Sequence, residues 1–544
     1  MKKIYSLLLG LVMAYGFIAC SDDDYSDKYK DPSKTGTASC DKLMTGVLYT
    51  GATFTYNSYW RMYTWENGGT LNGGTSVYAQ TIGFTNKEGD RYTLIDRYTN
   101  ARWQHFYNIL TQFRELQANY EKLPDVQKDV NRVFYLLSEI FVYDQLAQLI
   151  DAFGDVPFHE AGMLTVTGDL VSSYPSYDKA TDLYTMMLDN LGVISRQLKD
   201  GVSTTGLASQ DLLNKGDMGK WERYCNSLRL RLATRVASQG VLAEKGRQVI
   251  RDILEGDYPL VSVLSENVVA ISDDSGVSYV ADPAGLNFGD AFRDAYKEHR
   301  FASQAMLDVM LTEKTLGRND PRLQVMYSKN ASGEYKGLST RDPFASQQSN
   351  TATPAAAYLA YAQIDSTTII FNRNLKSPVV TAAEIHLTKA EAYQKGWASG
   401  SAKDAFVKGI LESVKFWYDM NATTINTYLI ETTIRKYEMP AESDVTAYAE
   451  KMWDAASNKE ELIAVQKWLN FGYLQGAQAW NEVRRTGYPV LHISTDDKAN
   501  ILPTPPNRIV YPSSESEYNT ANYQAQIQAM GGKDDYYMKL FWAK

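Results

Sequence analysis

Aromatic side chains are concentrated in one stretch near the N-terminus. Residues 49–107 contain 14 aromatic residues in 59 positions, about 24% against 12% for the whole chain. An aromatic ring can stack on the apolar C–H face of a sugar ring, while neighbouring amide and charged groups bond its hydroxyls. For any single ring, packing of the loop onto the rest of the fold is the favoured alternative. The candidates for ligand binding are Tyr59, Trp60, Tyr63, Trp65 and Asn67.

A second group of aromatic residues, further along the chain, is the alternative place for such a site. It consists of Tyr279, Phe288 and Tyr296. Tyrosine outnumbers phenylalanine by 38 to 18, which favours rings with a polar group over purely apolar ones. The glycine pairs that begin at Gly68 and Gly73 provide the backbone freedom that irregular loops need. The sequence therefore predicts ligand-binding rings that are carried by loops.

Sequence signatures of catalysis are missing. The chain contains no HExxH, GxSxG, P-loop or EF-hand pattern, and its three cysteines show no zinc-type spacing. Its five histidines are scattered, so a structural or surface role is expected for each. We predict a binding protein without catalytic residues or cofactor. A glycosidase pair of carboxylates and a structural calcium ion near Asp273 and Asp274 remain open alternatives.

The first twenty residues have the pattern of an export signal. Two lysines precede an apolar run that ends at Ala19 and is too short to span a membrane. Cys20 then precedes a serine and three aspartates, which is typical of a bacterial lipobox, although Phe17 stands where leucine is usual. The pattern predicts a signal peptide at 1–19 and a lipid anchor on Cys20, with an ordinary secretory signal as the alternative.

The totals describe a mildly acidic globular protein. Removal of residues 1–19 leaves 525 of the 544 residues and changes the net charge from −9 to −11, because two lysines leave with the signal. No later stretch reaches the eighteen or so apolar residues of a membrane helix, and the absence of basic clusters argues against nucleic acid as a partner. We expect a flexible tether at 20–39 and a single domain at 40–544. We expect free thiols at Cys40 and Cys225, with one disulfide between them as the alternative.

Apolar residues that recur at three- and four-residue steps predict a mainly helical fold. The clearest helix covers 125–151, and Gly154 in the following FGDVPF sequence is expected to end it. Two further helices begin with capping boxes, at Thr381 and Ser457. The predicted helices cover 97–122, 125–151, 176–199, 217–239, 242–255, 300–313, 381–395, 402–418, 458–470 and 473–485.

Three long stretches have no helical period, at 51–96, 257–298 and 328–380. Loops of that length inside a folded domain usually have a function. In the helical part, Ala390-x2-Tyr393 followed by Ala402-x3-Phe406 fits a tetratricopeptide-like spacing, in which small residues let paired helices approach closely. Generic helix packing is the alternative explanation of this weak repeat.

Several segments together resemble one family, the SusD/RagB nutrient-binding outer-membrane lipoproteins of the Bacteroidota. Their order and spacing cover nearly the whole mature chain. Trp480, Glu482, Arg484 and Arg485 lie in one of them; we expect them to close a helix by ion pairs and give them no ligand role. Besides the lipobox, the segments are FGDVPF (153–158), KWERYCNSLRLRLATR (220–235), VVTAAEIHLTKAEAYQKGW (379–397), QKWLNFGYLQGAQAWNEVRRTGYPVL (466–491) and PNRIVYPSSESEYNTANYQ (506–524).

The resemblance implies a mainly α, SusD-like fold with four tetratricopeptide-like helix pairs and a long-loop region that carries the ligand site. It also implies a non-catalytic lid of a SusC-like TonB-dependent transporter, which delivers glycan fragments to that transporter. The acids after Cys20 resemble those of members that face the cell exterior on the outer membrane. A peptide-binding lid of the same architecture is the alternative, and a lipid-anchored glycoside hydrolase is the less favoured one.

Overall fold

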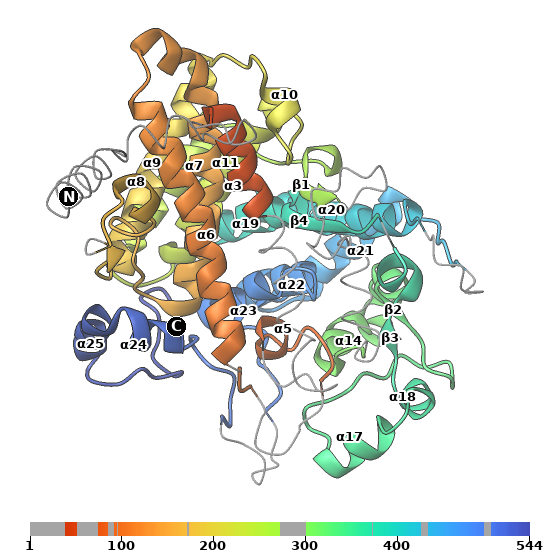
Figure 1. The fold of residues 1–544 in the computed structure, drawn as a ribbon. Helices are drawn as coiled ribbons and strands as arrows, with labels where there is room; N and C mark the ends of the chain where they lie inside the picture. The colour runs from red at the N-terminus through yellow and green to blue at the C-terminus, as the bar shows by residue number, and fades with distance from the viewer. Residues whose placement is uncertain are drawn as a thin grey trace, which may run out of the picture.

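Helices make up most of the computed structural model of this protein (Figure 1). The predicted signal peptide, the anchor residue Cys20 and the tether up to residue 37 lie outside the residues that the structure describes. The described residues are 38–51, 74–84, 92–94, 96–170, 173–271, 301–372, 374–425, 434–493 and 502–544.

The first group of helices includes the two longest in the described part of the chain. α6 and α7 are joined by a short connection in which Pro124 precedes the first residue of α7, so the two helices are antiparallel neighbours. The helices of this group are α3 (Cys40–Gly51), α5 (Thr75–Tyr78), α6 (Asp96–Glu121), α7 (Asp125–Phe153), α8 (Leu164–Thr167), α9 (Ala180–Asp200), α10 (Leu207–Gln210), α11 (Met218–Ala237) and α12 (Ala243–Glu255).

The middle of the chain consists of short elements. Two antiparallel two-stranded sheets form there, one from β1 and β4 and one from β2 and β3. In order, the elements are η3 (Leu264–Glu266), β1 (Val268–Ile271), α14 (Gln304–Met310), α15 (Glu313–Leu316), α16 (Leu323–Met326), β2 (Tyr327–Ser328), α17 (Phe344–Asn350), α18 (Pro354–Ala360), β3 (Gln363–Ile364), the π-helix η4 (Ser366–Ile370) and β4 (Lys376–Val380).

The remaining helices return the chain to the centre of the molecule. α22 and α23 lie between the first group of helices and the short elements of the middle of the chain, and α24 and α25 lie at one edge of the molecule (Figure 1). These helices are α19 (Ala382–Gln394), α20 (Ala402–Ala422), α21 (Glu442–Ala455), α22 (Lys459–Phe471), α23 (Gly476–Thr486), α24 (Ser513–Tyr518) and α25 (Thr520–Ala529).

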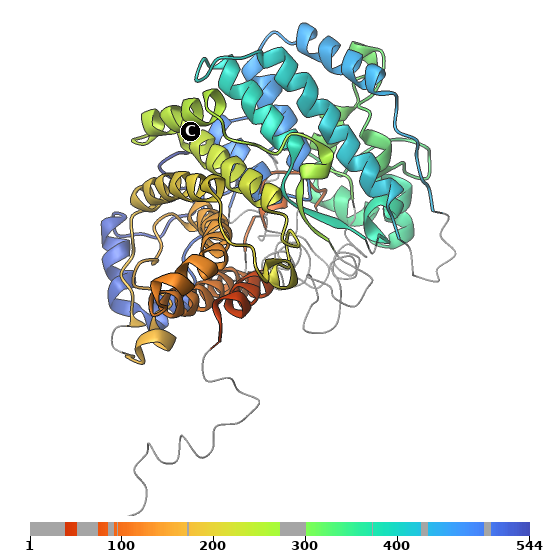
Figure 2. The same ribbon diagram turned by 90° about the horizontal axis from the view of Figure 1, so that it is seen from above.

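Neighbouring helices pack in a series along the chain. α3 packs on α6 and α7, α9 on α11, α11 on α12 and α19, and α19 on α20, which in turn packs on α21. Seen from above, these helices follow one another along an arc (Figure 2). The buried apolar residues form one continuous cluster that runs through the arc, and a small second cluster surrounds Phe301 and Tyr361.

The closest approach within the arc is between α19 and α20. A Cβ atom on Gly409 would lie 2.7 Å from the side chain of Leu387, so only glycine allows these helices to come so near. Ala390 and Phe406, from the predicted repeat, are both fully buried in the core. Their burial agrees with both the predicted repeat and generic helix packing, so the repeat stays a prediction.

All ten predicted helices are present, with some changes at their ends. The helix predicted at 300–313 is shorter, because Phe301 pairs with Gln363 in a β-bridge and the hydroxyl of Ser303 accepts the Met306 amide at the true start. The capping box at Ser457 was wrong: the cap is Asn458, whose side chain accepts the amide of Glu461. The cap at Thr381 is confirmed.

Helix α7 corrects the statement that no later stretch is apolar enough for a membrane helix. By length and composition it passes that test, and 83% of its most apolar window is buried inside the protein. Burial of the part from Val133 to Phe153 explains why that part is so apolar, as for a core helix. The helix ends at Gly154, as predicted, with φ at 90°. Cys40 and Cys225 are free and buried, which confirms the expectation of two thiols.

Candidate functional site

Every predicted ligand-binding residue lies in a part of the chain that the structure does not describe. The lipidation candidate Cys20 and the acidic pair Asp273 and Asp274 lie outside it as well. Within the described residues, no group of three or more His, Cys, Asp or Glu side chains could hold a metal ion. The ligand candidates outside the described residues are Tyr59, Trp60, Tyr63, Trp65, Asn67, Tyr279, Phe288 and Tyr296.

Described residues that come after the two groups of candidates, Tyr59 to Asn67 and Tyr279 to Tyr296, lie against each other. The amide of Gly83 donates to the carbonyl of Phe301 over 3.0 Å, and the hydroxyl of Ser303 donates to the carbonyl of Gln80 over 2.6 Å. A Cβ on Gly83 would lie 2.7 Å from the carbonyl oxygen of Ala302, so glycine is needed for this contact. The described segments that follow the two groups of candidates are thus joined by hydrogen bonds.

Residues 74–84 are held in place from two further directions. The side-chain amide of Gln80 donates to the carbonyl of His492 over 2.5 Å and accepts its amide over 3.0 Å. The indole of Trp468 on α22 donates to the carbonyl of Ala79 over 2.9 Å. Because Gln80 and Trp468 are buried, these bonds fix the segment that follows the first aromatic stretch onto the central helices.

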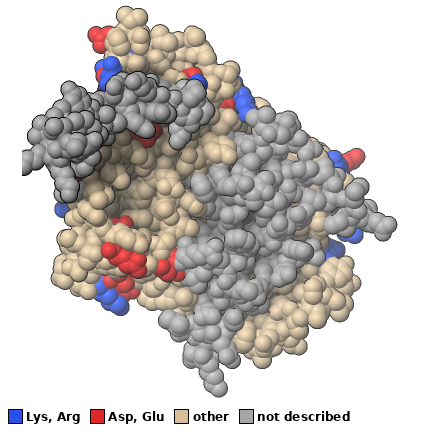
Figure 3. Space-filling view, in the orientation of Figure 1, with Lys and Arg blue, Asp and Glu red and all other residues tan. Residues whose placement is uncertain are grey.

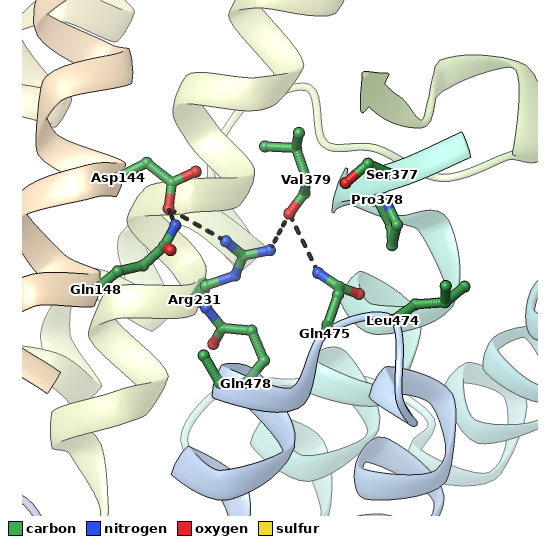
Figure 4. A pocket seen from close by; sticks show the side chains of 10 residues that line it. Asp144, Gln148, Arg231, Ser377, Pro378, Val379, Leu474, Gln475 and Gln478 are labelled. Carbon is green, nitrogen blue, oxygen red and sulfur yellow. Dashed lines mark hydrogen bonds and ion pairs between the residues drawn. The ribbon is translucent and has the colours of Figure 1, made fainter. Parts of the chain in front are cut away.

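A small pocket lies where α7, α11, β4 and the start of α23 meet (Figure 4). Its volume of about 30 Å³ holds about two water molecules and is well below the range of small-molecule sites. Polar side chains line one part of it and aliphatic side chains the other, without an aromatic ring. The lining residues are Asp144, Gln148, Arg231, Ser377, Pro378, Val379, Leu474, Gln475, Ala477 and Gln478.

Arg231 is the central polar side chain of this pocket. Its Nε and Nη2 donate to the carboxylate of Glu384 over 2.5 and 2.7 Å, and Nη2 also donates to the carbonyl of Val379 over 2.6 Å. Its Nη1 faces the carboxylate of Asp144 at 3.6 Å (Figure 4). Burial alone would lower the pKa of Arg231, but Glu384 raises it above its ordinary value, so the guanidinium is charged.

The pocket is built for hydrogen bonding rather than bond breaking. Asp144, Gln475 and Gln478 are at least nine-tenths buried, and no nucleophile with an adjacent base is among the lining residues. The sequence argument missed this site because its residues are far apart in the chain. Arg231, Gln475 and Gln478 do belong to the segments that carry the family resemblance, where we assigned them no role.

The residues expected to close α23 by ion pairs have three different roles. Arg485 pairs with Glu482 on its own helix at 2.7 Å and with Glu391 on α19 at 2.6 Å, so the expectation holds for these two of the four. Trp480 is uncharged, and its indole donates to the carbonyl of Pro506 over 3.1 Å. Arg484 stacks on Trp480 at 3.4 Å. It donates to the carbonyl of Asp151 at the end of α7 over 2.8 Å and to the carbonyl of Asn507 over 2.7 Å.

Charged side chains on the described part of the face in Figure 3 lie mainly near its edges. An acidic group lies at the lower left, and lysines and arginines are scattered. Most of the described surface of this face is therefore uncharged.

Comparison with known proteins decides the family. Residues 34–512 match the SusD-like family, which is described as starch-binding and associating with the outer membrane. The chain belongs to the SusD-like family. Membership makes it a nutrient-binding protein of the outer membrane without catalytic function, as the sequence predicted. No protein with a curated description matches this SusD-like chain.

Solved structures agree with the SusD-like fold. A SusD homologue from Parabacteroides distasonis is 20% identical, with a TM-score of 0.71 over 93% of this chain and 98% of the other. A SusD homologue from Bacteroides fragilis is 19% identical, with a TM-score of 0.66 over 92% and 99%. A chitin-binding SusD homologue from Flavobacterium johnsoniae is 20% identical, with a TM-score of 0.61 over 92% and 96%. At these identities the likeness establishes the mainly helical fold alone.

Proposed function

We propose that this SusD-like protein captures oligosaccharides at the cell surface through aromatic rings on its two long loops. The ligand-binding residues of this proposal are Tyr59, Trp60, Tyr63, Trp65 and Asn67, with Tyr279, Phe288 and Tyr296 as the second group. The observation that carries it is the direct bonding of the residues after both stretches, Gly83 to Phe301 and Ser303 to Gln80. Starch and chitin, the ligands of the family and of one structural relative, are both glycans.

Chain length limits how far the nearest member of each group can lie from the described chain. Asn67 is seven residues from Gly74, and Tyr296 is five residues from Phe301, where the described chain resumes. An extended chain spans at most about 3.6 Å per residue, so these side chains stay within roughly 25 and 18 Å of their anchored ends. The proposal is that members of both groups contact one oligosaccharide, and ring stacking with a few hydrogen bonds would give modest affinity.

The same proposal gives the protein its place and partner. Cys20 carries the lipid anchor, residues 20–39 are the tether, and residues 40–544 move as one body over the membrane. The acids after Cys20 favour the outer face, and a SusC-like TonB-dependent transporter receives the captured glycan. Anchoring by lipid and a flexible tether would let the body open and close over the transporter without leaving the membrane.

Affinity electrophoresis through gels that contain a polysaccharide tests glycan capture. We expect retardation by at least one polysaccharide of a panel that includes starch and soluble chitin derivatives. Trp60→Ala and Trp65→Ala should weaken retardation about tenfold or more, because each removes a stacking surface, and should leave the melting temperature unchanged. Tyr358→Ala is the matched control, since this exposed tyrosine on α18 lies outside both stretches.

Two results would contradict the proposal. The first is normal retardation of both tryptophan variants together with loss in Tyr279→Ala, Phe288→Ala and Tyr296→Ala variants, which would move the site to the second stretch alone. The second is no retardation on any polysaccharide while peptides bind, which would replace the sugar by the peptide alternative.

A further inference from the structure

Gln80 stands at a backbone position that glycine usually occupies. It follows the last turn of α5, where its amide donates to the carbonyl of Val77 over 3.1 Å. The next amide, that of Thr81, donates to the carbonyl of Ser76 over 2.9 Å. These two bonds form a Schellman motif, in which the residue after the helix cap takes the left-handed conformation. Gln80 takes it with φ at 54°, a conformation that is strained for residues other than glycine.

The side chain of Gln80 gives a reason for this strain. It is buried, and its amide group bonds the backbone of His492 in both directions, with Nε2 as the donor to the carbonyl and Oε1 as the acceptor of the amide. Glycine would relieve the backbone but has no group that makes these bonds. Asparagine adopts the left-handed conformation more readily, yet its side chain is one methylene group shorter. Glutamine therefore combines the reach and the two bonds that this contact needs.

Three segments of the chain meet at Gln80. Its backbone carbonyl accepts the hydroxyl of Ser303 at the start of α14, two residues after Phe301. Its side chain bonds His492, one residue before the described chain ends at Ile493. The hydroxyl of Thr340 donates to the same carbonyl of His492 over 2.8 Å and so supports that segment from a second direction. We call the contacts of Gln80 with Ser303 and His492 the Gln80 junction.

We propose that Gln80 is a positioning residue of the ligand site, which fixes the two aromatic stretches relative to each other through the Gln80 junction. It does not contact the ligand itself, because its side chain is buried. Without the junction, a glycan that contacts both stretches would have to order them on binding, and affinity would fall. The inference rests on the proposed glycan capture and names a residue that capture depends on.

Affinity electrophoresis of Gln80→Asn tests this role. The variant keeps an amide group and suits the left-handed backbone, but its side chain does not reach His492. In gels that contain soluble starch or glycol chitin, we expect retardation at least fivefold weaker than for the unchanged protein. Gly409→Ala is the control, because it disturbs the α19–α20 contact, in which Gln80 takes no part, and it should be retarded normally. A merely structural role of Gln80 would leave both variants alike.

Gln80→Glu adds a pH profile. A protonated glutamic acid has one donor and one acceptor, as glutamine has, whereas its carboxylate would face the carbonyl of His492 without a donor. Burial raises the pKa of such a carboxyl group. Titration calorimetry with soluble starch or glycol chitin should therefore show at least threefold tighter binding by Gln80→Glu at pH 6 than at pH 8. The nearby charged groups are the imidazole of His492, Asp308 and Arg341, and the unchanged protein at both pH values measures their effect.

Hydrogen exchange measured by mass spectrometry tests the junction without a glycan. In Gln80→Asn the amide of His492 loses its acceptor, and the amide of Gly83, which donates to Phe301, loses the support of its neighbour. We expect peptides from 74–84, 301–303 and 490–493 to exchange at least tenfold faster than in the unchanged protein. Peptides from α12 should exchange at the same rate in both proteins.

The proposal is overturned if Gln80→Asn is retarded as strongly as Gly409→Ala, or if Gln80→Glu binds equally at pH 8 and pH 6. Its failure differs from a failure of glycan capture, which fails when the unchanged protein is not retarded on any polysaccharide gel. In that case hydrogen exchange decides about the junction. Faster exchange in Gln80→Asn would support Gln80 as the residue that holds the three segments together, and unchanged exchange would overturn it.

Discussion

Two buried carboxylates and two buried cations meet in one group between α19, α22 and α23. Glu391 and Glu482 lie between Arg485 and Lys467, with nitrogen to oxygen distances of 2.6 to 3.2 Å. All four are less than one-tenth exposed. Removal of such charges from water is costly, and the cost is offset only while each charge keeps its opposite. The group is therefore sensitive to the loss of any one member.

Arg485→Met should lower the free energy of unfolding by about 3–5 kcal/mol, because two buried carboxylates would share Lys467 alone. Urea unfolding followed by circular dichroism measures this. Arg251→Met is the control: its pair with Glu244 is exposed, and such a pair contributes about 1 kcal/mol or less. Equal losses in both variants would show that the buried group has no special weight.

At the scale of elements, helix α7 depends on residues that follow it by more than 300 positions. Its last four carbonyl groups, from Ile150 to Phe153, would have no partner within the helix. Gly154 bonds the first of them, the Arg484 side chain the second, the Ile509 amide the third and the Arg508 side chain the fourth. Two cations thus lie at the negative end of the helix dipole, and the C-terminal segments complete the longest described helix.

Gly409→Ala should destabilise the protein by about 1–3 kcal/mol, because the added methyl group would overlap Leu387 and push α19 from α20. The gain in helix propensity, about 1 kcal/mol, is too small to offset the overlap. Gly46→Ala is the matched control on α3: its methyl group would meet only the end of the flexible Gln112 side chain. Chemical unfolding that shows Gly409→Ala to be as stable as Gly46→Ala would contradict the tight α19–α20 contact.

At the scale of the whole molecule, buried polar contacts join helices that the hydrophobic core also joins. Arg231 links α11 to α7 and α19, and Arg485 links α23 to α19. Arg235 on α11 lies 3.3 Å from Asp151 on α7 and bonds Gln478 on α23. The arc of helices and the central helices are therefore connected by groups that must keep their charge, which makes the global stability dependent on pH.

Acid should destabilise the protein in two steps. Burial lowers the pKa of His386 to about 4. Between about pH 6.5 and 4 this histidine is therefore protonated more in the unfolded chain than in the folded one. The free energy of unfolding then falls as the pH falls through that window. Burial alone would raise the pKa of Glu391 and Glu482, but Arg485 and Lys467 lower it. Stability held by these carboxylates is present above about pH 4.5 and is lost below it.

The measurement is the free energy of unfolding between pH 7 and 4 for the unchanged protein and His386→Gln. The glutamine can still donate to the carbonyl of Ser262, which accepts from the histidine ring over 2.8 Å. We expect a shallower decline in the variant, by at most about 1.4 kcal/mol per pH unit, the limit for one proton. Burial raises the pKa of Glu139 and Asp365 and so opposes the decline, equally in both proteins. Parallel curves would exclude His386 as the cause.

A helix could be predicted from the sequence where apolar residues recur at helical spacing. α21 carries such a signal as well, since Val445, Tyr448, Ala449 and Met452 are buried at helical spacing, and it was overlooked. α25 carries almost none, because Gln526 is its only buried residue and tertiary contacts hold it. Helix caps are also local features of the sequence. One of the two predicted caps was wrong by a single residue, because serine and asparagine stand at neighbouring positions and both are good caps.

The sequence by itself determined the helical class and the resemblance to the family, because period, caps and motifs are local properties of the chain. The export signal and the aromatic loops lie outside the described chain and stay predictions. Only the tertiary structure decided which distant residues meet: Gly83 with Phe301, and Arg231 with Glu384 and the glutamines of α23. Such contacts depend on how the helices pack, and packing is a property of all the helices together, which no single segment specifies.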